Sequence, residues 1–521
     1  MPTPTAVPHP STTVASKATS CQRMALLTAS GVCALIVLDT NIVAVTLPRI
    51  ARDLHATFAD IEWVVSAYML TFAAGLLPAG SLADKFGRKR TLLIGLLVFI
   101  VASLACGLAP TALTLNIARG VKGIGAALLL TSALATIAHA FHDEAERARA
   151  WAFWGACMGV AMLVAPGLGG IISQIFGWRW VFLLNLPVGA GLALLVMRYI
   201  QESRNTEAAR IDLWGSALFC SSLFLLIWAL IDANRIGWTN LQTSLRAGAG
   251  VALFALFIVS QRLQRKPMID LALFRNPRFI GALLAMAAYA GCAQVMMTLI
   301  PLHLQISLGF TAMASGAAML PFALTMLIFP RIGIHLAHRM QPSSVLSLGL
   351  LLVGLGNLLS AWAVSTTSYL PFALAIAVTG SGAGLLNGDT QKNIMACVPR
   401  DRAGMASGLS TTTRFSAIVL SFGLLGGLLA HRTHVGLEHA IATALDTASF
   451  SSLGLDALVA RLVAGDLAGA LSGLGHGMQT TLEPIARLAY ADAFAWILAV
   501  AGIIALICAV AVSTLMTRPA R

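Results

Sequence analysis

Three charged residues in the first half of the chain lie well inside long apolar stretches, where a charge needs a partner or a function. Asp39 lies in the run 24–47, and Arg119 and Lys122 are three positions apart in the run 113–138. Loss of hydration disfavours the charged form of a carboxylate, so Asp39 could bind and release a proton near neutral pH. A guanidinium keeps its charge and needs an acidic or carbonyl partner, for which Asp39 is the candidate. We predict a proton-coupling group formed by these three residues, with a static ion pair as the alternative.

Lys122 and Arg119 are expected on nearly the same face of one helix, because residues three apart are neighbours there. Two adjacent cations repel each other. Lys122 therefore either loses its proton more readily than a free lysine or extends toward a helix end, and the sequence leaves open whether it takes part in the mechanism.

The polar segment 80–90 separates two apolar runs and contains two glycines, one acid and four bases. Such a segment does not fit in hydrocarbon, so it predicts a charged turn between two membrane helices. Gly80 and Gly87 would permit the turn, and Asp84 could cap a helix of the other half of the protein. Arg88 and the neighbouring bases also fit plain anchoring at the cytoplasmic surface. Anchoring alone does not explain the acid or the glycines.

The apolar run 150–174 contains Ala165, Pro166, Gly169 and Gly170. Small residues at helical spacing let two backbones approach closely, and proline bends a helix. We expect a kinked, tightly packed gate helix, although ordinary helix packing would use the same residues.

Polar residues in the second half of the chain are candidates for a substrate pathway, because polar groups inside a bilayer usually face a cavity. They are Gln294, Gln305 and Arg414. Glu62 and Asp232 lie near the outer ends of their apolar runs, where we expect solvent to reach them.

The composition indicates that lipid solvates most of this chain. Hydrophobic residues make up 58% of the 521 residues and charged ones only 11%, with a mean hydropathy of +0.83. A helix needs about 20 apolar residues to cross the hydrocarbon. The sequence predicts an all-α polytopic membrane protein with fourteen spans. They are 24–47, 61–82, 91–110, 113–138, 150–174, 180–198, 213–231, 245–260, 279–300, 313–334, 343–364, 369–390, 404–430 and 489–516.

The net charge of +13 is explained by topology. Lys and Arg concentrate in alternate connecting segments, including both chain ends, which places the termini in the cytoplasm by the positive-inside rule. No clustered basic face exists, which argues against nucleic acid as a partner. No CxxC pair, HExxH, nucleophile elbow or phosphate-binding glycine loop occurs, so we expect no catalytic residue, metal site or cofactor.

The spans group as six, two and six. The predicted division is a disordered cytoplasmic tail (1–23), a first six-helix bundle (24–198), two linker spans with basic loops (199–278), a second bundle (279–516) and a short cytoplasmic tail (517–521). The stretch 431–488 is expected outside the cell, as a long loop with a pair of short amphipathic helices at the membrane surface.

Seven segments, in order, resemble the fourteen-helix branch of the drug:proton antiporters of the major facilitator superfamily. They are Leu38–Thr40 through Pro48, Trp63–Val64 with Ala67–Tyr68, Gly80–Arg90, Arg119 with Gly123 and Gly125, Pro166 with Gly169–Gly170, Gly177–Phe182 through Asn185–Pro187, and Leu304–Gln305 with Gly309, Gly316 and Pro321. The chain departs from that pattern at four positions: Lys122 replaces a usual Gln, Ala161 and Ala165 replace usual Gly, and Glu62 replaces a neutral residue.

This resemblance implies two six-helix bundles with two additional central helices. It also implies export of amphipathic, often cationic, small molecules by alternating access, in exchange for protons. Asp39 and Arg119 would be the coupling pair and Gly80, Asp84, Gly87 and Arg88 the gating loop. The expected location is a bacterial inner membrane, with any periplasmic adaptor unknown. An importer or a dedicated exporter of one metabolite is the alternative on the same fold, and a membrane enzyme or sensor is a third reading without a supporting motif.

Overall fold

The computed structural model describes residues 20–141, 144–204, 212–236, 240–264, 271–337, 339–366, 368–398, 403–444, 454–472 and 475–517. All regular secondary structure in these ranges is helical. The predicted tails 1–23 and 517–521 lie mostly outside the described residues, although residues 20–23 and 517 belong to helices and not to tails.

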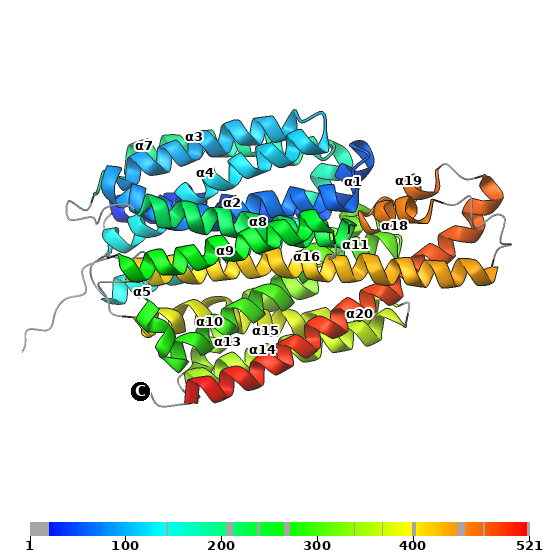
Figure 1. Cartoon of the computed structure of the whole chain (residues 1–521). Coiled ribbons are helices and arrows are strands. Elements are labelled where there is room, and N and C mark those ends of the chain that lie inside the picture. The colour runs from blue at the N-terminus through cyan, green and yellow to red at the C-terminus, as the bar shows by residue number, and fades with distance from the viewer. Residues whose placement is uncertain are drawn as a thin grey trace, which may run out of the picture.

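The first half of the chain forms a bundle at the top of Figure 1. Its helices are α1 (Ser20–Asp53), α2 (Phe58–Phe86), α3 (Arg88–Gly107), α4 (Ala112–Ala140), α5 (Glu144–Ile175), α6 (Arg179–Leu183) and α7 (Asn185–Tyr199). Local sequence explains where two of them start. Thr57 and Asp60 form a capping box at the N-terminus of α2, and Thr111 and Thr114 do the same for α4. The backbone N–H groups of these four residues therefore have side-chain acceptors.

The second half forms another bundle below the first (Figure 1). Its elements are the 3₁₀ turn η1 (Leu271–Arg275), α10 (Pro277–Tyr289), the π-helical turn η2 (Ala290–Gln294), α11 (Met296–Ile306), α12 (Ala312–Ala318), α13 (Leu320–Ala337), α14 (Pro342–Val364), α15 (Tyr369–Ala396), α16 (Ala403–Ala444) and α20 (His476–Thr517). Helix α8 (Leu213–Ile236) packs against α2 of the first bundle and α16 of the second, and α9 (Leu241–Leu263) packs against α8.

Twelve helices or abutting helix pairs of the described chain are long and apolar enough to cross a membrane. Two further predicted spans coincide with α2 and with the apolar part of α8, Trp214–Leu230. The prediction of an all-helical, multi-pass protein is confirmed. The number of crossings stays a prediction.

The expectation for 431–488 was partly wrong, because the flanking helices continue far into it. Helix α16 ends only at Ala444 and α20 begins at His476. Charged residues lower the hydropathy of these extensions, but their Ala- and Leu-rich sequence still favours helix. Two short helices do lie between them, α18 (Leu455–Val463) and α19 (Leu467–Leu471). Helix α18 packs against α16, α2 and α20, and α19 packs against α18 and α20.

The two ends of the bundle can be distinguished by contacts. At the end that we call terminal, the Gln22 side chain donates to the Ala140 carbonyl at 3.0 Å, and α20 reaches the C-terminus there (Figure 1). At the opposite end, which we call distal, Arg52 pairs with Asp466 at 3.2 Å next to α19.

Candidate functional site

The three predicted coupling residues meet inside the first bundle. Asp39 of α1 accepts from Lys122 Nζ at 2.5 Å and from Arg119 Nη1 at 3.2 Å, both of α4. Asn185, the first residue of α7, donates from Nδ2 to Asp39 Oδ1 at 2.8 Å. All four side chains are at most 1% exposed. The site therefore joins three helices around one carboxylate.

Small residues on α4 let its bases reach this position. A Cβ at Gly125 would lie 2.9 Å from the Phe99 backbone nitrogen of α3, and one at Gly123 would overlap the Tyr68 carbonyl of α2. Helix α4 thus packs directly on the backbones of its neighbours. The Thr71 hydroxyl of α2 bonds the Gly120 carbonyl at 2.7 Å and holds the same contact.

Aromatic rings complete the enclosure of both cations. The Arg119 guanidinium lies 4.2 Å from the centre of the Tyr68 ring. Lys122 Nζ lies 4.7 Å from the ring of Phe99 and 5.0 Å from that of Phe182. Cations are attracted to aromatic faces, most strongly where water is absent. The Arg119 Nε group also donates to the Val64 carbonyl at 2.9 Å.

This arrangement fits the deprotonated form of Asp39, because its two oxygens accept from three donors. Two cations face one anion, so the cluster carries excess positive charge if both bases are protonated. Lys122 does not extend toward a helix end, which answers one of the two open readings. Asn185 belongs to one of the segments that carry the family resemblance, but no pattern in the sequence assigns it to the carboxylate.

The predicted turn at 80–90 is narrower than expected. Helix α2 continues to Phe86, so Gly80 lies within a helix and makes no turn, because the residues after it have no helix breaker before Gly87. Gly87 alone separates α2 from α3, with φ = 108°, a backbone conformation that favours glycine. The side chain of Asp84 lies outside the described part of the structure, so its predicted capping role stays a prediction.

An acid that the sequence did not single out closes this turn. Glu202, after α7, accepts from the backbone N–H groups of Lys89 at 3.1 Å and Arg90 at 3.2 Å. These are free donors at the start of α3, where a negative charge is favourable. The Arg88 N–H donates to the Ser203 carbonyl at 2.9 Å. A Cβ at Gly87 would overlap the Glu202 carboxylate.

The predicted gate helix α5 joins the two bundles at close range. A Cβ at Gly170 would lie 2.6 Å from the Ala312 carbonyl of α12, and one at Gly316 of α12 would overlap the Pro166 carbonyl. Gly169 packs in the same way on Ile42 of α1, and Ala165 is fully buried. The structure thus brings all four predicted residues to helix–helix contacts, two of which lie between the bundles.

The three predicted pathway residues take part in two separate contacts. Arg414 of α16 donates from Nε to Gln294 Oε1 at 2.7 Å, next to the π-helical turn η2, and lies 5.5 Å from the Tyr289 ring. Gln305 of α11 instead donates to the Val45 carbonyl of α1 at 3.3 Å. It therefore bridges the bundles.

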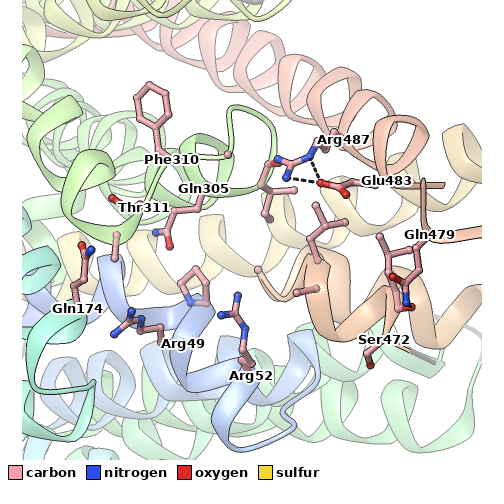
Figure 2. A pocket seen from close by; sticks show the side chains of 18 residues that line it. Arg49, Arg52, Gln174, Gln305, Phe310, Thr311, Ser472, Gln479, Glu483 and Arg487 are labelled. Atoms are coloured by element: carbon pink, nitrogen blue, oxygen red, sulfur yellow. Dashed lines mark hydrogen bonds and ion pairs between the residues drawn. The ribbon is translucent and has the colours of Figure 1, made fainter. Parts of the chain in front are cut away.

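Gln305 also lines a cavity of about 670 Å³ at the distal end, shown in Figure 2. Arginines from both bundles face it: Arg49 and Arg52 of α1, and Arg487 of α20, which pairs with Glu483 at 2.8 Å. Gly309, Thr311 and residues of α19 line it as well. The cavity is polar. Of the arginine and amide side chains that line it, the sequence predicted a functional role only for Gln305.

The expectation that solvent reaches Glu62 and Asp232 was wrong. Their exposed fractions are 1% and 5%. Helices α8 and α16 pack against α2 and cover this region. Asp232 forms an ion pair with Arg246 of α9.

The comparisons with known proteins agree with this architecture. Residues 29–422 match the family model described as the Major Facilitator Superfamily. The chain belongs to the Major Facilitator Superfamily. It is similar to the multidrug resistance protein Stp of Mycobacterium tuberculosis, with 35% identity over 78% of this chain and 75% of the relative. The methylenomycin A resistance protein of Streptomyces coelicolor is 30% identical over 82% of this chain and 88% of that protein.

Solved structures support the same fold. A bacterial homologue of the human lysosomal transporter Spinster, in an inward-facing and unoccupied conformation, superimposes with a TM-score of 0.64, covering 96% of this chain and 98% of that one. At 14% identity, this likeness concerns the fold alone. The family prediction made from the sequence is confirmed, and the family consists of transporters and not enzymes.

Proposed function

We propose that this chain exports amphipathic small molecules, drugs among them, in exchange for protons by alternating access of its two bundles. The buried Asp39–Arg119–Lys122 group is the observation that carries the proton-coupling step. The names of its relatives, which include multidrug resistance and antibiotic resistance proteins, support export. We further propose fourteen membrane crossings. Twelve helices or helix pairs are long and apolar enough to cross, and α2 and α8 coincide with the two remaining predicted spans.

In the proposed cycle, Asp39 takes up a proton while the site is open to the outside. Neutralising this carboxylate leaves Arg119 and Lys122 without their anion, and both would then repel each other. The contact that links α1 to α4 is weakened as a result, which favours the rearrangement that exposes the substrate site inward. Substrate binding and proton release there return the engaged state. One elementary charge crossing a potential of about 100 mV contributes roughly 2.3 kcal/mol.

The sidedness of the chain belongs to the same proposal. The positive-inside pattern of the sequence supports cytoplasmic termini in a bacterial inner membrane, which would place the distal cavity with its arginines outside. The Gly87 turn with Arg88 would then form the cytoplasmic gating segment, and the α5–α12 contact the outer one. Gln294, Gln305 and Arg414 remain the proposed substrate-pathway residues.

Purified protein in liposomes under an imposed pH gradient tests this function. The wild type should accumulate substrate against its gradient when the pH gradient is applied, and Asp39→Asn should lose that accumulation. Asp53→Asn is a matched control, because Asp53 lies on the same helix with a carboxylate that is 50% exposed. Equal pH-driven transport by the wild type and Asp39→Asn would remove Asp39 from the mechanism. Transport in the opposite direction would indicate the importer.

A further inference from the structure

Glu62 is a buried acid at the contact between the two bundles. It lies on α2 near the distal end, is 1% exposed, and its Oε1 atom has no hydrogen-bond partner among the described residues. The carboxyl group faces α16 and α8. A Cβ placed on Gly423 of α16 would lie 2.9 Å from Glu62 Oε1 and 3.0 Å from Leu230 of α8.

Charged groups on α2 and on the helices packed against it have other partners in the described structure. In the first bundle, Asp60 of α2 bonds with Thr57, Arg52 of α1 with Asp466, Lys89 of α3 with the Met197 carbonyl, and Arg119 of α4 with Asp39. Asp232 of α8 pairs with Arg246, Arg414 of α16 with Gln294, and Arg432 of α16 with the Trp496 ring. On α18, Asp456 pairs with His434 and Arg461 with the Gly469 carbonyl. Within the described part of the chain, no ion pair joins Glu62 to any of these groups.

An unpaired carboxylate costs several kcal/mol when it is buried in its charged form, whereas the neutral acid is tolerated. The closed contact between α2 and α16 therefore favours a protonated Glu62. Because α2 belongs to the first bundle and α16 to the second, a change in the relative position of the bundles would alter this contact. Water admitted there would stabilise the carboxylate and release the proton.

We propose that Glu62 is a second proton-binding group of the transport cycle, protonated while α2 and α16 are in contact and deprotonated when the contact opens. This inference rests on the proposed proton-coupled export. It assigns a role to a residue that distinguishes the chain from the pattern it otherwise resembles, in which a neutral residue is usual at this position.

The steady substrate gradient in proteoliposomes tests the proposal, measured at several imposed pH gradients with the membrane potential clamped at zero. Each coupled proton supports a tenfold substrate gradient per pH unit, because both amount to about 1.4 kcal/mol. Glu62→Gln should lower the gradient tenfold per pH unit relative to wild type. Glu62→Asp, which keeps an acid, should retain the wild-type slope.

Asp456→Asn is the matched control, because Asp456 lies on α18 with a carboxylate that is 96% exposed. An unchanged slope in Glu62→Gln would overturn the proposal. A wild type whose gradient does not respond to pH would instead overturn the proposed function, so the two failures are distinguishable.

Two further measurements decide the matter if Glu62→Gln does not transport. Gly423→Ala places a methyl group against the Glu62 carboxyl and should change the pH at half-maximal transport while preserving the slope. Infrared difference spectra of purified protein in lipid should show a protonated carboxyl band that is lost in Glu62→Gln. Identical spectra, or an unshifted pH profile in Gly423→Ala, would contradict the proposal.

Discussion

Asp39 and Glu62 lie on consecutive helices of the same bundle and are equally buried, yet their surroundings differ completely. Asp39 accepts from two cations and one amide, all from its own bundle. Glu62 Oε1 has no donor in the described structure and faces the opposite bundle. Burial alone therefore does not distinguish a carboxylate held by ion pairs within one bundle from one that faces the other bundle. The two carboxylates differ in which groups surround them and in whether those groups belong to the same bundle or to the opposite one.

The comparison also separates two ways of coupling a proton to movement. At Asp39, protonation would break ion pairs that hold α1, α4 and α7 together. At Glu62, movement between α2 and α16 would change the hydration of the acid. The first site acts within one bundle and the second between the two, so a single cycle can use both.

Replacing each acid by its amide should affect stability very differently, and this is the largest difference that we expect. Asp39→Asn leaves two buried cations without an anion, which should lower the free energy of unfolding by about 3–5 kcal/mol. Glu62→Gln removes no ion pair and should be neutral or slightly stabilising. Thermal unfolding of both variants in the same detergent measures the difference. Equal destabilisation would show that Glu62 also makes a stabilising interaction in the folded protein.

Lys122 should be energetically coupled to Asp39 and not to Glu62. Removing one of the two cations relieves the repulsion left by Asp39→Asn, so Lys122→Gln in that background should recover about 1–3 kcal/mol. In the Glu62→Gln background, the same substitution should have the effect that it has in wild type. A double-mutant cycle on unfolding stability checks both. Strict additivity with Asp39→Asn would mean that Lys122 carries no charge in the folded protein.

Much of this architecture followed from the sequence, because hydropathy and spacing determine which segments cross lipid and which helices carry charges. The meeting of Asp39 with Arg119 was expected on these grounds. Hydropathy places a residue along its helix but does not say what covers it. Glu62 was therefore assigned to solvent, although α16 packs over it and α18 packs on α2. Asn185 and Glu202 were missed for a similar reason, since each acts on a helix distant in sequence.

The extent of the helices beyond the membrane was the other limit. Polar residues after position 430 ended the predicted span, but helix continues to Ala444 because intrahelical hydrogen bonds do not need lipid. Helices α18 and α19 follow this extension at the distal end, where α19 lines the cavity together with Arg49, Arg52 and Arg487.

The smallest expected effect concerns Asp212, an acid at the start of α8 that neither bundle motion nor proton coupling should involve. Its partial burial opposes the charged form. Hydrogen bonds from the Gly215 N–H at 2.7 Å, Gln261 at 2.7 Å and Gln264 at 3.0 Å outweigh that and lower the pKa of Asp212 below its usual 3.8.

A carboxyl whose pKa is lowered by folding stabilises the protein above its unfolded pKa, and this contribution disappears as the pH falls through the folded value. Asp212→Asn should therefore cost about 1 kcal/mol near neutral pH and progressively less below pH about 4. Unfolding measured as a function of pH checks this, with transport at neutral pH expected to stay close to wild type. If the substitution instead changed the slope of transport against the pH gradient, proton coupling would extend to the linker helices, and the distinction between Asp39 and Glu62 would describe only part of the pathway.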